Sequence, residues 1–265
     1  MPHLGPPLKI PFAQCRSREF LNLSEVDAVI AQMSLTRSPV RNQALAILLF
    51  CQALQPIELC WLRWCDLNFA EKILLVTRNR TKTTRCQSQQ IVINLQPLCP
   101  TEIEVLQQLY EQRTTDWIFA SERKQRLSER SLHHIIRQAG ELASLALSVH
   151  PYMLRRSGLY YRAALLLKPL GLSLRECCLL WNWHQTNIPF SAEAEQEYRA
   201  MKPQQKTAFL AALERMRGFS GITTKENTID YLLGAFLLFP HLQGIPNDFW
   251  LTPPGWESGN FAEKI

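Results

Sequence analysis

The segment that decides the fold reads His150-Pro151-Tyr152-Met153-Leu154-Arg155-Arg156-Ser157 and predicts the start of a buried helix. Pro151 suits a first helical turn, because an N–H at that position has no partner inside the helix, and an apolar run follows at 159–167. Two adjacent guanidiniums at the mouth of this helix need anionic partners. Since arginine binds phosphate bidentately, a phosphodiester is one candidate. In the alternative reading, Arg155 pairs with an internal carboxylate and Arg156 is solvated.

A second segment lies upstream and reads Leu54-Gln55-Pro56-Ile57-Glu58-Leu59-Cys60-Trp61-Leu62-Arg63-Trp64-Cys65-Asp66-Leu67. It resembles the GLRxxELxxLxWxDL segment of the tyrosine recombinases, the phage integrase family. Tyr152-Met153-Leu154-Arg155-Arg156 resembles the HxLRH box of the same family. The order and spacing of the two boxes fit, and the resemblance covers roughly Ser24 to Met201. The match is good in scaffold residues and poor in catalytic ones.

Hydrophobic periodicity predicts a mainly α-helical chain with a small antiparallel β-sheet, an α+β fold. The resemblance implies the same architecture, that of the recombinase catalytic domain. Ser24, Thr101 (with Glu104 in a capping box) and Ser128 are expected to cap helices. Helices are expected at about 24–33, 40–54, 56–64, 101–113, 128–143, 151–168, 173–183, 191–201, 203–217 and 226–239, and strands at 72–77 and 90–94.

The expected organisation is an extended N-terminal arm at 1–22, a recombinase catalytic-like domain at 23–218, and a C-terminal helical extension and tail at 219–265. Recombinases commonly carry a separate N-terminal DNA-clamping domain, and the stretch before the match is expected to be too short for one. The C-terminal helices are predicted either to dock on another subunit or protein partner, or to fold back over the site. The sequence leaves both options open.

Composition favours an anionic partner and a cytoplasmic location. The formal net charge is +6 with a pI near 9.0, and 46% of the residues are hydrophobic, as in ordinary globular proteins. The chain has eight cysteines without a C-x-x-C pair, so we expect no zinc site, no other metal and no cofactor. The longest apolar runs, at 44–51 and 231–239, are too short to span a bilayer, so no membrane partner is expected.

In the resembled family a tyrosine attacks a phosphodiester, assisted by two arginines, a lysine and histidine-type groups. The first arginine falls on Gln55, which carries no charge, and the lysine falls on Lys82. The histidines on either side of the second arginine are replaced by Tyr152 and Arg156, whereas Arg155 is retained. A phenol with a pKa near 10 shuttles protons poorly at neutral pH. These replacements predict that the recombinase chemistry has been lost.

The last two family positions are less well defined. Trp183 occupies the place of the third histidine, with His184 next in register, and a plain core tryptophan is the alternative. The nucleophile position lands on Ala192, and Tyr198 is the tyrosine within reach, which requires about six extra residues. Tyr198 follows three glutamates that disfavour a phenolate beside phosphate. An ordinary helix tyrosine is the alternative.

Many cations fall in segments that face or flank DNA in the resembled family. They predict contact with the backbone of double-stranded DNA, with an affinity that falls with salt. A scattered, solvated surface charge is the alternative. The predicted DNA-contacting residues are Arg41, Arg78, Arg80, Lys82, Arg85, Arg123, Lys124, Arg126, Arg155 and Arg156.

Three functions remain open at this point. The first is a DNA-binding pseudoenzyme that does not cleave DNA and is associated with the nucleoid. The second is an active site-specific recombinase with a rearranged centre, which requires an arginine from elsewhere beside Arg155 and a phenol over the same spot. The third is a protein-interaction module on a recombinase fold.

Overall fold

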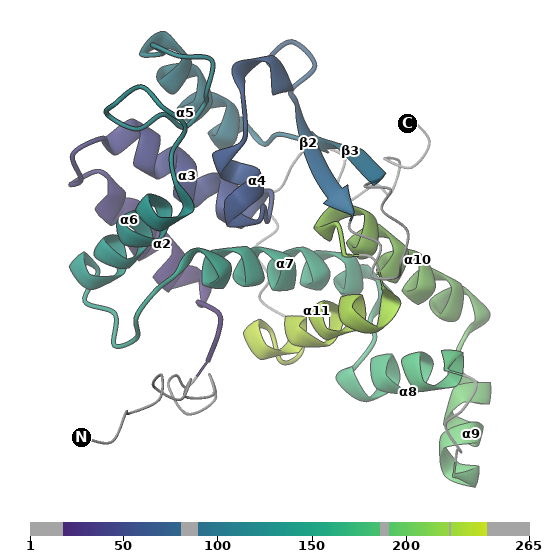
Figure 1. Cartoon of the computed structure of the whole chain (residues 1–265). Coiled ribbons are helices and arrows are strands. Elements are labelled where there is room, and N and C mark those ends of the chain that lie inside the picture. The colour runs from purple at the N-terminus through teal and green to yellow at the C-terminus, as the bar shows by residue number, and fades with distance from the viewer. Residues whose placement is uncertain (1–17, 81–89, 186–190, 223, 243–265) are drawn as a thin grey trace, which may run out of the picture.

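The computed structural model describes residues 18–80, 90–185, 191–222 and 224–242. They form a mainly helical fold with one small antiparallel sheet (Figure 1), which confirms the predicted fold class. No helix in these ranges is both long enough and apolar enough to cross a membrane. The helices are α2 (Leu23–Met33), α3 (Pro39–Cys51), α4 (Pro56–Cys60), α5 (Pro100–Glu111), α6 (Glu129–Leu142), α7 (Pro151–Leu167), α8 (Leu174–His184), α9 (Ala192–Ala200), α10 (Pro203–Ser220) and α11 (Lys225–Leu238).

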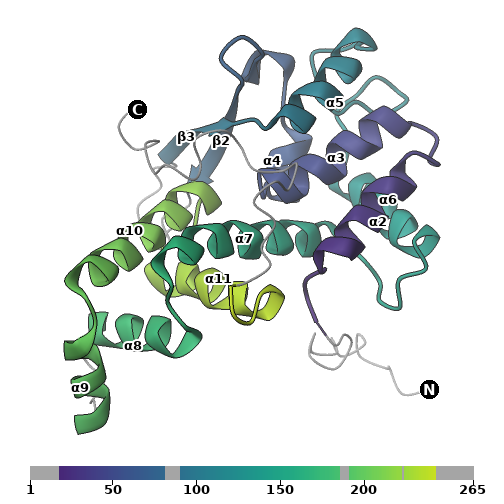
Figure 2. The same ribbon diagram turned by 180° about the vertical axis from the view of Figure 1, so that it is seen from behind.

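Helix α7 is the central element, and most of its residues are buried. It packs against α3, α10 and α11, and the two opposite views show these helices on different sides of it (Figures 1 and 2). Gly158 allows the closest of these approaches, because a Cβ atom at this position would lie 1.9 Å from the carbonyl oxygen of Phe50 on α3. The predicted start of α7 at Pro151 is confirmed.

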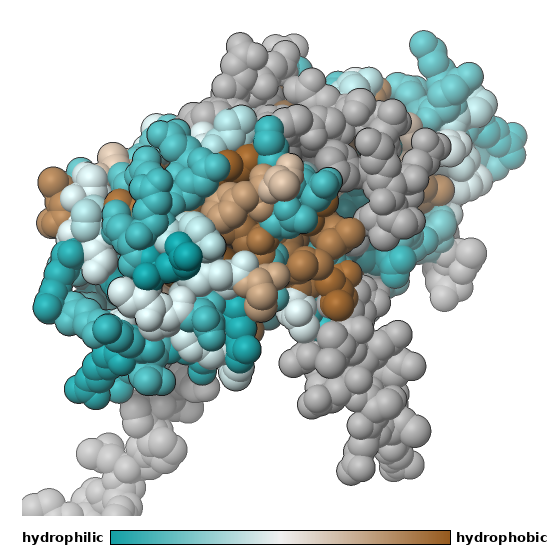
Figure 3. All heavy atoms as spheres, turned by 90° about the horizontal axis from the view of Figure 1, so that it is seen from above, coloured by the Kyte–Doolittle hydropathy of each residue, from teal (hydrophilic) through white to brown (hydrophobic). Residues whose placement is uncertain are grey.

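The sheet contains β1 (Leu67–Asn68), β2 (Ile73–Arg80) and β3 (Gln90–Pro97) in the order β1-β2-β3. Leu74, Val76 and Arg78 alternate along β2 and are buried, so one face of this hairpin is turned inward. On β3, Ile93 and Leu95 are 61% and 41% exposed on the other face. When the whole molecule is seen from above, apolar residues gather near the middle of the visible face (Figure 3).

Two predicted helix caps are wrong, and one is confirmed. Helix α2 is capped by Asn22 rather than Ser24, because the Asn22 side chain accepts from the backbone N–H of Glu25 at 2.9 Å. Helix α5 starts at Pro100 with Cys99 at its N-cap, and Glu102 accepts from the Cys99 N–H at 2.8 Å. The predicted Thr101–Glu104 box is therefore shifted by two residues. Ser128 caps α6 as predicted.

The C-terminal helices fold back onto the rest of the chain. Helices α10 and α11 pack on each other and both contact α7 (Figure 2), so the described part of this extension lies against the rest of the chain. The predicted boundary between residues 218 and 219 lies inside α10. Helix α4 ends at Cys60, earlier than predicted, and is followed by a 3-10 helix at Trp64–Asp66.

Candidate functional site

The site begins at the amino end of α4. Gln55 is the N-cap residue, and its backbone N–H donates to Oε2 of Glu58 at 2.7 Å. This bond holds the Glu58 carboxylate at the junction of α4, β2 and α7, where its side chain is only 8% exposed. The uncharged residue Gln55 thus contacts, through its backbone N–H, a buried carboxylate that needs a cation.

Two buried arginines from distant parts of the sequence share that carboxylate. Nε of Arg78 lies 3.1 Å from Oε1 of Glu58, and Nη1 of Arg155 lies 3.9 Å from Oε2. Both arginine residues are 5% exposed. Burial lowers the pKa of the Arg155 guanidinium, and the Glu58 charge opposes that effect. Since one anion faces two cations, the cluster keeps an excess positive charge and needs further acceptors.

The carboxyl end of α10 supplies those acceptors. Nη2 of Arg155 donates to the carbonyl oxygen of Ser220 at 2.9 Å, and Nη1 of Arg78 donates to that of Phe219 at 2.7 Å. These carbonyls lie at the negative end of the helix dipole, which favours cations. Gly221 then ends the helix with a φ of +70°, and a Cβ here would lie 2.3 Å from Nη1 of Arg78. Helix α10 therefore closes the arginine cluster from one side.

The structure does bring a second arginine beside Arg155, but it is Arg78 from the sheet and its partners are internal. A phenol is also present in this region, because Tyr231 on α11 lines the same hollow as Arg156, the residue that follows Arg155. Each of the two guanidiniums donates to a backbone carbonyl of α10, so the acceptors described for them are internal. The reading in which Arg155 pairs with an internal carboxylate describes the observed contacts.

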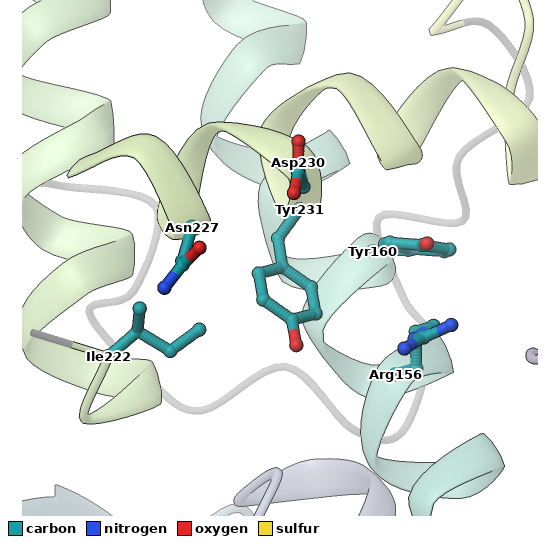
Figure 4. A pocket seen from close by; sticks show the side chains of 6 residues that line it. All are labelled: Arg156, Tyr160, Ile222, Asn227, Asp230 and Tyr231. Carbon is teal, nitrogen blue, oxygen red and sulfur yellow. The ribbon is translucent and has the colours of Figure 1, made fainter. Parts of the chain in front are cut away.

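The residues near Arg155 in the sequence do not share its contacts, and each has a different environment. Tyr152 is 45% exposed, with its ring 6.5 Å from that of His133, and partial burial raises its phenol pKa. His150 occupies the N-cap of α7, and its Nε2 lies 3.0 Å from Glu19. Arg156 is half-buried and lines a hollow between α7 and α11 (Figure 4).

Trp183 and Tyr198 lie together, but not with the arginines. Their rings stack at 4.0 Å with an interplanar angle of 12°, and Nζ of Lys206 lies 3.9 Å from the centre of the Tyr198 ring. Tyr198 is on α9, which lies beyond α8 at the outer end of the molecule in both ribbon views (Figures 1 and 2). The described contacts of Tyr198 hold it against α8 and α10 instead of over Arg155.

The remaining predicted DNA contacts fall into two groups. Lys82, Arg85 and the side chain of Arg80 lie outside the described residues. In the segment between α5 and α6, Arg123 and Lys124 are exposed, and the Arg126 guanidinium lies 4.2 Å from the centre of the Trp61 ring. Arg41 ties this segment to α3, because its Nη1 donates to the carbonyl of Ala120 at 3.0 Å. Arg123 and Lys124 are therefore accessible to a polyanion.

One group of potential metal ligands occurs in the described part of the chain. A sulfur of Cys51, a sulfur of Cys99 and a carboxylate oxygen of Glu102 lie within 4.8 Å of one another and are buried. Glu102 is already occupied, since it accepts from the Cys99 N–H and, at 2.7 Å, from Nε2 of Gln52. Burial raises the pKa of Glu102 well above its usual range, and the hydrogen bond with Cys51 lowers that of the Cys99 thiol to about 6.

Sequence reasoning missed Glu58 and the α10 carbonyls. Glu58 carried a usable signal, because it matches the glutamate of the quoted ELxxLxW pattern and is followed by apolar positions on a short helix. The contribution of Phe219 and Ser220 had no such signal. Their backbone oxygens are available at any helix end, and only the packing of α10 brings them to the arginines.

Comparison with known proteins places these features in a family. The model of the "Phage integrase family" matches residues 19–161. The type 1 fimbriae regulatory protein FimB of Escherichia coli K12 is 28% identical over 151 residues, which is 55% of this chain and 71% of FimB.

Two solved structures share the fold. The crystal structure of XerA recombinase has a TM-score of 0.51 at 18% identity and covers 86% of this chain. That of XerH site-specific recombinase bound to its palindromic difH substrate has a TM-score of 0.50 at 13% identity and covers 80%. This chain spans 62% of the XerA chain and 48% of the XerH chain.

Proposed function

Because this chain belongs to the phage integrase family, we propose that it is a DNA-binding protein that keeps the tyrosine recombinase fold without cleaving DNA. The observation that carries this proposal is the closure of the arginine cluster. Arg155 and Arg78 share Glu58, and each donates one hydrogen bond to a carbonyl of α10, that of Ser220 or Phe219, so the described partners of both guanidiniums lie inside the protein.

The loss of cleavage follows from what the cluster lacks. A transition state of phosphoryl transfer needs preorganised donors aimed at its developing charge, each worth about 3–4 kcal/mol. Gln55 offers no charge, and Tyr198 stacks on Trp183 at the outer end of the molecule. Groups that act as one catalytic unit lose most of their benefit together. Residual cleavage by this arrangement is therefore expected to be negligible.

Binding to double-stranded DNA is supported by charge and by kinship. The chain has a formal net charge of +6, and Arg123 and Lys124 are exposed on one segment. The XerH structure contains a recombinase on its DNA substrate, and we extend that partner class to this chain. Phosphate contacts of this kind give an affinity that falls steeply with salt and a modest sequence preference. The proposal places the protein in the cytoplasm with the nucleoid.

A mobility-shift titration on duplex DNA tests the binding. We expect a complex at low salt whose affinity falls linearly in a log–log plot against salt concentration, with a slope near −0.9 per phosphate contact. A chain that binds no duplex at low salt would refute the proposal.

A nicked suicide substrate tests the absence of cleavage, because it traps any covalent phosphotyrosine adduct. We expect no adduct on the same duplexes that shift in the titration. An adduct that disappears in Tyr198→Phe or in Tyr231→Phe would instead establish an active enzyme with a rearranged centre, and it would identify the nucleophile.

A further inference from the structure

The hollow between α7 and α11 has a volume of about 470 Å³, within the range of about 300–1,000 Å³ that is usual for small-molecule sites. Arg156 and Tyr160 lie four residues apart on α7, while Asp230 and Tyr231 follow Asn227 by three and four residues on α11. These spacings put each set on one face of its helix, and the two faces meet at the hollow (Figure 4).

The polar side chains of the hollow are not used by the fold. Within the described ranges, no hydrogen bond or ion pair involves the side chain of Arg156, Asn227 or Asp230. Arg156 and Asp230 have opposite charges and line the same hollow, yet they do not pair with each other. The hydrogen-bond donors of Arg156 and the acceptors of Asp230 are thus held apart. Both are available to a ligand that carries an acceptor for Arg156 and a donor for Asp230.

The aromatic rings are held more firmly than the polar groups. The Tyr160 ring is buried against α11, where a Cβ at Gly234 would lie 2.1 Å from its edge, so a glycine at 234 is needed for this placement. The Tyr231 ring centre is 6.1 Å from that of Tyr160, at 52°. Figure 4 shows the Tyr231 ring between Asn227 and Ile222 on one side and Arg156 and Tyr160 on the other. Tyr231 therefore offers a flat apolar surface within the hollow.

From this arrangement we propose that the hollow binds a nucleoside monophosphate unit with an amino-bearing base. The Arg156 guanidinium takes the phosphate, and the Tyr231 ring stacks on the base. Asp230 and Asn227 lie at the base edge, where a carboxylate accepts from an exocyclic amino group and an amide both donates and accepts. Thymine has no exocyclic amino group, so adenine and cytosine nucleotides are preferred to thymidine monophosphate.

Such a unit has two possible sources, a free nucleotide or an unpaired nucleotide of bound DNA. The site for the free nucleotide is independent of the proposed DNA-binding function. The unpaired nucleotide depends on that function, since the duplex has to bind first.

Equilibrium dialysis of the full chain with labelled dAMP at low salt tests the site. We expect dAMP to bind more tightly than thymidine monophosphate or inorganic phosphate. Arg156→Met and Tyr231→Ala are each expected to weaken dAMP by about tenfold or more, and Asp230→Asn to reduce the preference over thymidine monophosphate. Arg137→Met is the matched control, because Arg137 is exposed on α6 and pairs with Glu141. Thermal unfolding of each variant confirms that it is folded.

The proposal fails if dAMP does not bind, if inorganic phosphate binds as tightly, or if folded Arg156→Met binds dAMP like the unchanged protein. Competition between dAMP and a short duplex that carries one unpaired adenosine shows whether the natural ligand is a free nucleotide or an unpaired nucleotide of DNA. Displacement of dAMP by this duplex, and not by a fully paired one, assigns the site to DNA. If dAMP still binds and neither duplex displaces it, the site belongs to a free nucleotide. This assignment holds even if the chain binds no duplex.

Discussion

The Arg155 guanidinium donates a hydrogen bond of 2.9 Å to the carbonyl oxygen of Ser220, a residue 65 positions further along the chain. This contact joins the helix that carries the recognisable arginine box to the last residue of α10. The contact gives a buried guanidinium a backbone acceptor at the carboxyl end of a helix, where the helix dipole favours a cation.

Substitution of Glu58 tests whether the buried arginines depend on it. Glu58→Gln keeps the shape but removes the anion between Arg78 and Arg155, leaving two buried guanidiniums with uncompensated charge. We expect urea denaturation to show a loss of about 3–5 kcal/mol in the free energy of unfolding. Glu214→Gln is the control, because Glu214 is 42% exposed and pairs with Arg217 and Lys225 at the surface. There the loss should stay below about 1 kcal/mol. Equal losses in both variants would show that the cluster is not sustained by Glu58.

Substitution of Gly221 tests how closely the end of α10 approaches Arg78. Gly221→Ala adds a Cβ at a φ of +70° and directly against the guanidinium. Gly171→Ala adds one at a φ of +60° with no atom within 4 Å, so it reports the backbone strain alone, about 1–2 kcal/mol. We expect Gly221→Ala to lower the free energy of unfolding further, by an additional amount of about 1–3 kcal/mol from the displaced Arg78. If both variants lose the same free energy, α10 does not press on Arg78 as described.

Substitution of Glu102 tests its buried protonation equilibrium. Because burial raises the pKa of Glu102 above 4.5, the folded chain keeps this proton to a higher pH than the unfolded chain. Rising pH therefore favours unfolding through this group. Glu102→Gln removes the effect, so its stability relative to the unchanged protein should improve by about 1 kcal/mol between pH 5 and 6.

That comparison is best made below the Cys99 pKa of about 6, because a lowered thiol pKa stabilises the folded chain as pH rises above it. Glu104→Gln is the control for Glu102→Gln, since Glu104 is exposed on the same helix. A stability difference for Glu102→Gln that is independent of pH would mean that Glu102 is ionised throughout the range.

Substitution of the exposed cations between α5 and α6 tests the proposed DNA contact. Arg123→Ala with Lys124→Ala should weaken duplex binding and reduce the slope of log affinity against log salt by about 2 if each residue contacts one phosphate. Arg199→Ala with Lys202→Ala is the control, because it removes the same charge near the α9–α10 junction. If both pairs change the slope equally, only net charge matters and the contact is not located on this segment.

Local sequence signals predicted the start of a helix well where a single residue type has a physical reason to occupy that position. Pro151 marked the start of α7 and Ser128 the start of α6, because both preferences arise from the first turn of a helix. The same rules failed at Ser24 and Thr101, because each helix is capped two residues earlier, by Asn22 and by Cys99. At Asn22 a signal was present, since Glu25 follows three residues later as in a capping box, whereas Cys99 is not a typical N-cap residue.

The sequence by itself determined the α+β architecture and the family, because these depend on periodicity and on residue identity at fixed spacings. The tertiary structure alone decided what Arg155 contacts. Glu58, Arg78 and Ser220 belong to three separate segments, and a buried guanidinium binds whichever acceptors packing delivers to it. The strength of an ion pair or hydrogen bond depends on the distance between its atoms in space. The packing of α10 and β2 against α7 sets the distances from Arg155 to its acceptors.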